Sequence, residues 1–361
     1  MTATVAVVGG GYGGVTAAKA LDDVADVVLI EPRDAFVHNV AALRGVTDQD
    51  WAERLFIPYD KLLTRGTVKR DRAVEVTATT VRLASGETVE ADYIVLATGS
   101  TAPYPANIDA LDRETGKKKL DATRAELELA SHVLLLGAGP VGLEFAGEIK
   151  ASWPDKAVTV VDPQPRLLSG ASFPEEFHTE LRAQLDRLGV VVLLGTALRE
   201  LPSVQPGAVG AFTVTTDSGD DIAADIWFRC YGTTANSDIL GADLGAALRP
   251  DRRVAVTPEL RVQGLRTVFA VGDLTALPEL KMARLAQKHA EVVAGNIRTL
   301  IEGGTELTAY QPEGADSIVL PLGPEWGVTY APEAGVLGAS VTADIKGTFF
   351  LDSYRELLNQ K

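Results

Sequence analysis

The chain has 361 residues and is 46% hydrophobic, which is enough to bury the cores of two or three domains. Its formal net charge of -15 and its pI of about 4.8 disfavour broad contact with a nucleic acid, because nucleic acids are polyanions. The single cysteine, Cys230, excludes an intramolecular disulfide and a redox pair of thiols. The four histidines are scattered and predict no metal site.

The beginning of the sequence predicts no targeting segment. The first strand begins almost at Met1, which leaves no room for a signal peptide, and no apolar run reaches membrane-spanning length. Thr2 stands where an N-myristoylated protein carries glycine. We therefore expect a cytoplasmic protein.

The opening stretch predicts a dinucleotide-binding site, which we name the first clamp. An apolar strand over 5–8 leads into glycines spaced G-x-G-x-x-G, and a helix over 15–21 follows. The first glycine allows a tight turn, the second lets a pyrophosphate approach the backbone, and the third lets helix and strand pack closely. A second strand over 27–30 ends at an acid that suits a ribose. The predicted contacts are Gly9, Gly11, Tyr12, Gly13, Gly14 and Glu31.

Three features follow before the next unit. The segment 38–44 mixes polar and small residues, and we interpret it as an active-site segment. Residues 74–89 alternate about the turn at Ser85-Gly86, which predicts an antiparallel ribbon. A buried strand over 93–96 ends in Ala97, Thr98 and Gly99, small residues across which a cofactor can lie.

The pattern of the first clamp then repeats. Pro103 and Pro105 mark a break, and we predict that the run 117–119, three lysines, is a solvated loop or a helix end. A strand over 132–136 leads into a second G-x-G-x-x-G, a helix continues to about Lys150, and a strand over 158–161 ends at an acid. This second clamp belongs to a second domain, because one mononucleotide pair cannot span 128 positions between Gly9 and Gly137. Its predicted contacts are Gly137, Gly139, Pro140, Val141, Glu144, Asp162 and Gly232.

The remaining elements complete two domains. We expect a helix over 181–188, a strand over 190–193, a ribbon over 212–222, strands over 226–232 and 267–271, and a helix over 281–300. The predicted fold class is α/β, with two Rossmann-like, glutathione-reductase-like domains and a small C-terminal α+β unit. The predicted borders are 1–105 and 246–305 for the two parts of the first domain, 106–245 for the second, and 306–361 for a separate C-terminal unit.

The contexts of the clamps predict which dinucleotide each one binds. The first clamp, with 97–99 and Gly272-Asp273, suits a tightly held FAD, whose ribitol hydroxyls would donate to Asp273, although a lone Gly-Asp can also be a simple turn. The helix start at Lys281, Met282 and Ala283 would stabilise negative charge at the flavin pyrimidine edge. The alternative for the Lys281 side chain is a surface charge.

The second clamp suits a nicotinamide nucleotide. Asp162 can accept both hydroxyls of a ribose but would repel a 2′-phosphate, so we expect NADH to be preferred over NADPH, although Arg166 lies close enough to weaken that preference. Glu144 would face the nicotinamide and the flavin N5. Its alternative role is that of an acid that suits the helix dipole.

These motifs resemble those of the pyridine-nucleotide flavoproteins with two dinucleotide sites, and most of all the apoptosis-inducing-factor-like quinone reductases typified by ferroptosis suppressor protein. The resemblance spans nearly the whole chain, and the matching stretches are 38–44, 97–101, 144–150, 281–283 and 353–355. It implies a non-covalent FAD, reduced by NAD(P)H, that passes electrons to a ubiquinone or menaquinone. It also implies that Arg44, Asp273 and the backbone near Ala73 contact FAD.

Departures from that family concern the membrane and the quinone. Thr2 forbids the family's lipid anchor, and Arg284 with Gln287-Lys288 replaces less polar residues near the expected quinone entrance. An apolar face of the last segment would pack on the protein itself, on a second subunit in a homodimer, or on lipid as a peripheral membrane contact. The residues of this face are Phe350, Leu351, Tyr354, Leu357 and Leu358.

The sequence thus predicts an FAD-dependent NADH:quinone oxidoreductase with His38, Glu144 and Lys281 as its catalytic residues. His38 is included because its segment should lie near the isoalloxazine. One alternative is a reductase of a small electron-transfer protein such as a ferredoxin or rubredoxin. Another is an NADH-responsive flavoprotein sensor that signals through dimerisation.

Overall fold

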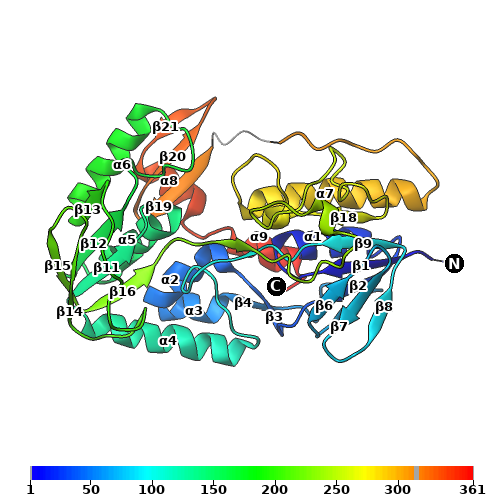
Figure 1. The fold of residues 1–361 in the computed structure, drawn as a ribbon, viewed down its shortest axis with the longest axis horizontal. Coiled ribbons are helices and arrows are strands. Elements are labelled where there is room, and N and C mark those ends of the chain that lie inside the picture. Colours follow the sequence, from blue (N-terminus) through cyan, green and yellow to red (C-terminus); the bar gives the residue numbers. More distant parts are fainter. Residues whose placement is uncertain (1, 313–316, 361) are drawn as a thin grey trace.

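The computed structural model describes residues 2–312 and 317–360 and has two lobes, each built on a parallel sheet (Figure 1). The first sheet has the strand order β18-β9-β1-β2-β5, and all its neighbours are parallel. Its strands are β1 (Thr4–Val8), β2 (Asp26–Ile30), β5 (Thr67–Lys69), β9 (Tyr93–Leu96) and β18 (Val268–Ala270). The sheet therefore joins the start of the chain to a strand from far along the sequence.

Two helices pack together beside the first sheet. Helix α1 (Tyr12–Leu21) begins earlier than predicted, because Gly13 and Gly14 belong to its first turn. Helix α7 (Ala283–Ile301) packs along α1 and begins after Met282, two residues later than predicted. Burial of their facing apolar side chains, such as Val15 and Val293, gives this lobe its core.

The second sheet has the order β13-β12-β11-β16, again parallel throughout. Its strands are β11 (His132–Leu136), β12 (Ala157–Asp162), β13 (Val190–Leu194) and β16 (Ile226–Arg229). The helices of this lobe are α4 (Arg113–Leu129), α5 (Pro140–Ser152) and α6 (Glu175–Arg187) (Figure 1). Both lobes are thus Rossmann-type α/β units, as predicted.

The lysine run 117–119 lies inside α4, so the prediction of a loop or helix end was wrong. The side chain of Asp112 caps the helix by accepting from the backbone amide of Thr115 at 2.8 Å. Lys118 then pairs with Glu114 one turn earlier. A cap and an i,i+4 ion pair outweigh the mutual repulsion of three solvated lysines.

Smaller elements surround the two sheets. The ribbon predicted over 74–89 has three strands, β6 (Ala73–Val76), β7 (Thr80–Leu83) and β8 (Thr88–Glu90), and the one predicted over 212–222 is β14 (Phe212–Thr215) with β15 (Asp221–Ala224). The other elements are β3 (Ala35–Val37), β4 (Phe56–Pro58), η1 (Asn39–Ala41), α2 (Ala42–Thr47), α3 (Gln49–Arg54), β10 (Ser100–Thr101), β17 (Thr234–Ala235), η2 (Gly245–Ala247) and η3 (Gly272–Leu274).

The C-terminal part divides between the lobes instead of standing apart as we predicted. Strands β19 (Ile318–Leu322), β20 (Trp326–Ala331) and β21 (Gly335–Leu337), with α8 (Ala339–Lys346), pack on α5 and α6. Helix α9 (Leu351–Leu357) packs on α1 instead (Figure 1). Apolar residues of β19 and β20 join the core around the second sheet, and those of α9 join the core around α1 and α7, because the C-terminal part is too short to bury a core of its own.

The apolar face of the last segment packs mainly on the protein's own body, which was one of its predicted outcomes. Leu351, Tyr354 and Leu358 are buried, whereas Phe350 is 48% exposed. Phe349 and Phe350 both adopt positive φ, at 50° and 57°. Such backbone geometry is strained for a bulky side chain, and here it turns the chain from α8 into α9.

Candidate functional site

The glycines of the first clamp have the distinct roles that the motif predicts. Gly9 has φ +106°, and a Cβ there would lie 2.4 Å from the carbonyl oxygen of Ala97. A Cβ on Gly14 would lie 1.8 Å from the oxygen of Gly9, so neither position tolerates a side chain. A Cβ on Gly11 would have no neighbour within 4 Å. Open space beside this backbone fits the approach of a pyrophosphate.

Glu31 is held in place at the end of β2. Its Oε2 accepts from the Gly10 amide at 2.7 Å, and its Oε1 accepts from the Arg33 amide at 2.9 Å. Tyr59, which the sequence did not single out, donates to the Gly10 carbonyl at 2.8 Å. The carboxylate is therefore fixed with acceptor capacity left for ribose hydroxyls.

The second clamp repeats the two amide bonds to its acid. Asp162 Oδ2 accepts from the Ala138 amide at 2.6 Å, and Oδ1 accepts from the Gln164 amide at 2.8 Å. A Cβ on Gly142 would lie 1.9 Å from the oxygen of Gly137, whereas one on Gly139 would have no neighbour within 4 Å. The second clamp thus fits a dinucleotide by the same geometry.

The strand ends between the lobes lie together. Thr98 and Asn236 exchange two hydrogen bonds, of 2.7 and 2.9 Å, and β10 pairs with β17. Gly99 and Gly232 each leave open space where a Cβ would lie. Asn236 lies against the predicted contacts Thr98 and Gly99, and sequence reasoning missed it, although it stands only four positions after Gly232.

The predicted flavin contacts after β18 lie on one loop. Ser100 Oγ donates to Asp273 at 2.7 Å, so Asp273 faces the end of β9. Lys281 Nζ donates to the carbonyl of Leu277 at 3.1 Å, and burial lowers its pKa. Lys281 is therefore half-buried rather than a plain surface charge. Ala73 and Ala97 are buried at the start of β6 and the end of β9.

His38 is fully buried, and both its ring nitrogens are bound. Nε2–H donates to the carbonyl of Phe349 at 3.0 Å, so Nδ1 carries no proton and accepts from the Tyr12 hydroxyl at 3.1 Å. Burial lowers the pKa of His38 to about 4. Because both nitrogens of this neutral ring are occupied, the structure favours a role for His38 in holding Tyr12 and the C-terminal turn in place. A catalytic role for His38 stays a prediction.

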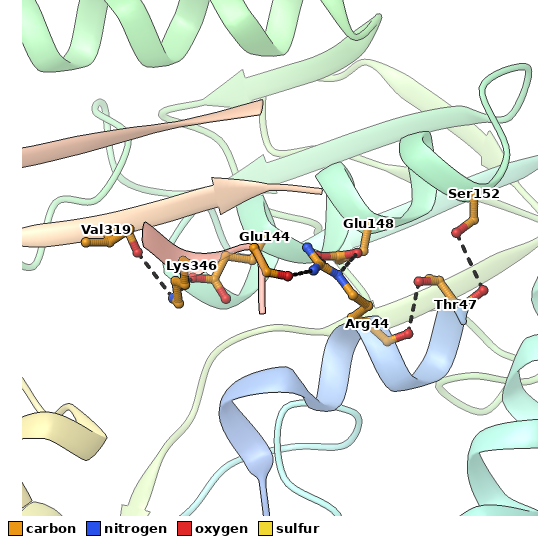
Figure 2. Close-up of polar contacts among 8 residues, drawn as sticks. Arg44, Thr47, Glu144, Glu148, Ser152, Val319 and Lys346 are labelled. Atoms are coloured by element: carbon orange, nitrogen blue, oxygen red, sulfur yellow. Dashed lines mark hydrogen bonds and ion pairs between the residues drawn. The ribbon is translucent and has the colours of Figure 1, made fainter. Parts of the chain in front are cut away.

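Arg44 lies in a buried ion pair that joins α2 to α5 (Figure 2). Its guanidinium donates to Glu148 at 2.8 Å through Nη2 and at 3.1 Å through Nε, and to the Gly347 carbonyl at 2.7 Å. The Phe349 ring lies 4.4 Å from its central carbon. The structure thus directs the Arg44 guanidinium toward α5 and the C-terminal turn, and the predicted contact with FAD stays a prediction.

Glu144 lies one turn before Glu148 on the same face of α5 (Figure 2). Lys346 pairs with it at 2.9 Å and also donates to the Val319 carbonyl at 3.2 Å. Both side chains are only 15% exposed. Sequence reasoning missed Lys346, and the spacing of the two glutamates was the one signal that α5 presents a charged face to a partner.

Two further structural facts bear on the site. Within the ranges that the structure describes, no helix is both long and apolar enough to cross a membrane. Among those same residues, no three His, Cys, Asp or Glu side chains lie together as metal ligands would.

The chain resembles known proteins over most of its length. Residues 3–290 match the family described as pyridine nucleotide-disulphide oxidoreductase. Ferroptosis suppressor protein 1 of Taeniopygia guttata is 32% identical over 332 residues, which cover 90% of this chain and 87% of that protein. The structure of the sulfide:quinone oxidoreductase of Aquifex aeolicus shares the fold with a TM-score of 0.77 at 19% identity, covering 99% and 92% of the two chains. NDH2 of Plasmodium falciparum, solved in complex with NADH, does so with a TM-score of 0.70 at 13% identity, covering 99% and 95%.

Proposed function

Since the chain belongs to the pyridine nucleotide-disulphide oxidoreductase family and is an FAD- and NAD(P)-dependent oxidoreductase, we propose that it oxidises NADH and reduces a quinone of the ubiquinone or menaquinone type. The observation that carries the proposal is the pair of clamps with equivalent hydrogen bonds at Glu31 and Asp162. Two dinucleotide sites in one chain suit electron transfer from one nucleotide to another.

FAD is the proposed ligand of the first clamp. Glu31 would bind its ribose, the open backbone at Gly11 and the start of α1 its pyrophosphate, and Asp273 its ribitol. Bound there, FAD would accept hydride from NADH and pass the electrons on. The start of α7, at Met282 and Ala283, would supply backbone amides to the flavin.

NADH is the proposed ligand of the second clamp. Asp162 is fixed by two amides where a ribose would lie, and its negative charge opposes a 2′-phosphate. Arg166, the residue that weakened this prediction, pairs with Glu175 and is 60% exposed. Such an exposed pair is weak, so the preference for NADH is supported by the charge of Asp162 and not by the pairing of Arg166.

Glu144 is proposed to lie beside the nicotinamide, with Lys346 balancing its charge. This pairing keeps a carboxylate near the reacting groups without leaving a lone buried charge. Cys230 is not proposed to react, because burial raises the pKa of its thiol to about 12 and keeps it protonated at neutral pH.

Fewer observations support the identity of the electron acceptor than support the NADH site. Quinone is supported by the similarity to ferroptosis suppressor protein 1 and by a shared fold with an enzyme named for its quinone. A small acidic electron-transfer protein is the alternative, and the net charge of -15 disfavours it by repulsion. Peripheral membrane contact through the exposed Phe350 would bring the protein to its quinone.

Anaerobic stopped-flow absorbance of the purified protein tests both half-reactions. We expect fast bleaching of the flavin by NADH, slower bleaching by NADPH, and fast reoxidation by a short-chain quinone. Fast bleaching followed by slow reoxidation would contradict the quinone assignment while leaving the NADH site intact. Mixing the NADH-reduced protein with an oxidised ferredoxin in place of the quinone tests the alternative acceptor.

A further inference from the structure

A buried network of three side chains lies behind the loop of predicted flavin contacts, and neither clamp uses it. His289 and Glu279 have side chains that are each 1% exposed, and His289 Nε2 lies 2.6 Å from Glu279 Oε1. The Tyr310 hydroxyl donates to the other carboxylate oxygen at 2.9 Å. Binding at both oxygens offsets the cost of burying this carboxylate.

A third contact fixes the protonation state of His289. The amide of Gly272 donates to Nδ1 at 3.0 Å. Because a backbone amide can only donate, Nδ1 carries no proton, and the ring proton lies on Nε2 and points at Glu279. The carboxylate therefore holds His289 in the one tautomer that can accept from Gly272.

Together these bonds hold the loop 272–282 at both ends. Gly272 opens the loop with φ +67°, and Glu279 lies near its far end. The predicted flavin contacts on the loop and at the start of α7 are Gly272, Asp273, Lys281, Met282 and Ala283. The network thus attaches the loop that carries these predicted contacts to α7 through His289 and to the following segment through Tyr310.

We propose that Glu279, His289 and Tyr310 are positioning residues for FAD, which shape the loop 272–282 so that Asp273 and the start of α7 meet the flavin. The inference rests on the proposed function, because it takes FAD as the ligand of the first clamp. Tyr310 lies beyond the residues 3–290 that match the family. The C-terminal part of this chain therefore contributes to the cofactor site.

The test is the rate at which the holoprotein releases FAD on dilution, followed by the fluorescence of the freed flavin. His289→Leu removes both ring contacts and should speed release about tenfold or more, because the loss of even one buried hydrogen bond is worth about tenfold. His289→Asn keeps an acceptor near the Nδ1 position and should recover part of the retention. Tyr310→Phe, which removes one hydroxyl, should give a smaller change of the same sign.

Asn296→Leu is the matched control. Asn296 is also buried on α7, and it binds the backbone of Thr308 and Glu259 without touching the loop. It should lower the unfolding temperature while leaving FAD release within about twofold of wild type. Equal release from His289→Leu and Asn296→Leu would overturn the inference, because the network would then be only a part of the general fold.

The remaining outcomes separate this inference from the proposed function. A wild-type protein that neither contains nor takes up FAD would overturn both. A wild-type protein that holds FAD, with variants that release it at the same rate, would overturn the inference alone. If His289→Leu does not fold, wild-type release from both His289→Asn and Tyr310→Phe would overturn it.

Discussion

The first and second clamps have the same backbone and different surroundings. In each, an acid at a strand end accepts from two amides, and the middle glycine leaves open space. Tyr12 follows that glycine in the first clamp and packs against Tyr354 with ring centres 5.1 Å apart, whereas the second clamp has an exposed Pro140 there. We infer that the first clamp, which these two tyrosines cover, suits a resident cofactor. The second clamp, which is exposed at this position, suits a substrate that must leave.

Breaking the buried ion pair between α2 and α5 should have the largest effect. Arg44→Met leaves Glu148 buried without its cation, and we expect the free energy of unfolding to fall by about 3–5 kcal/mol in denaturant melts. The control is Arg82→Met. Arg82 and its partner Glu75 are 52% and 47% exposed, so this change should cost less than about 1 kcal/mol. Similar losses in the two variants would contradict a buried link.

Acid should lower the stability of the protein through the buried His38, which binds Tyr12 of the first clamp. His38 has an ordinary pKa of 6.5 that burial lowers to about 4, so between these values the unfolded chain takes up a proton that the folded ring does not. Stability therefore falls as the pH drops through this window, by about 3 kcal/mol from this group. His38→Gln should flatten that slope in melts across the window. Parallel curves for the variant and the wild type would contradict the buried neutral ring.

Changing the acid of the second clamp should have the smallest effect. Asp162→Ala removes the carboxylate proposed to bind the NADH ribose, so we expect about tenfold weaker NADH binding and a smaller preference over NADPH. FAD should stay bound. The measurement is the ratio of kcat/KM for the two nucleotides, together with the flavin content. Loss of flavin instead would mean that the two clamps are assigned in reverse.

The sequence predicted the parts of the fold that local patterns encode. Glycine spacing, strand hydrophobicity and terminal acids were enough to predict both clamps and to place Glu31 and Asp162, because each feature lies within a few residues of the next. The loop prediction at 117–119 failed because it considered only the charge of the lysines and not the helix cap that Asp112 provides. The C-terminal unit was read as separate because the pattern of a helix face does not reveal what covers it.

The contacts between residues far apart in the sequence were not predictable from local patterns. Arg44 and Glu148 are 104 positions apart, and Glu144 and Lys346 are 202 apart, so each pair forms only when the whole chain has folded. Nothing near Lys346 distinguishes it from a solvated lysine at a helix end. The same holds for His289, whose partners Gly272 and Tyr310 come from a loop and from the chain beyond α7.

The most direct test of the division between the clamps is the visible spectrum of two purified glycine variants. Gly14→Ala places a Cβ 1.8 Å from the oxygen of Gly9, and Gly142→Ala places one 1.9 Å from that of Gly137, so each distorts one clamp. We predict that Gly14→Ala purifies without FAD, while Gly142→Ala keeps a full complement of FAD that NADH no longer bleaches. Loss of FAD from Gly142→Ala with its retention in Gly14→Ala would contradict the account.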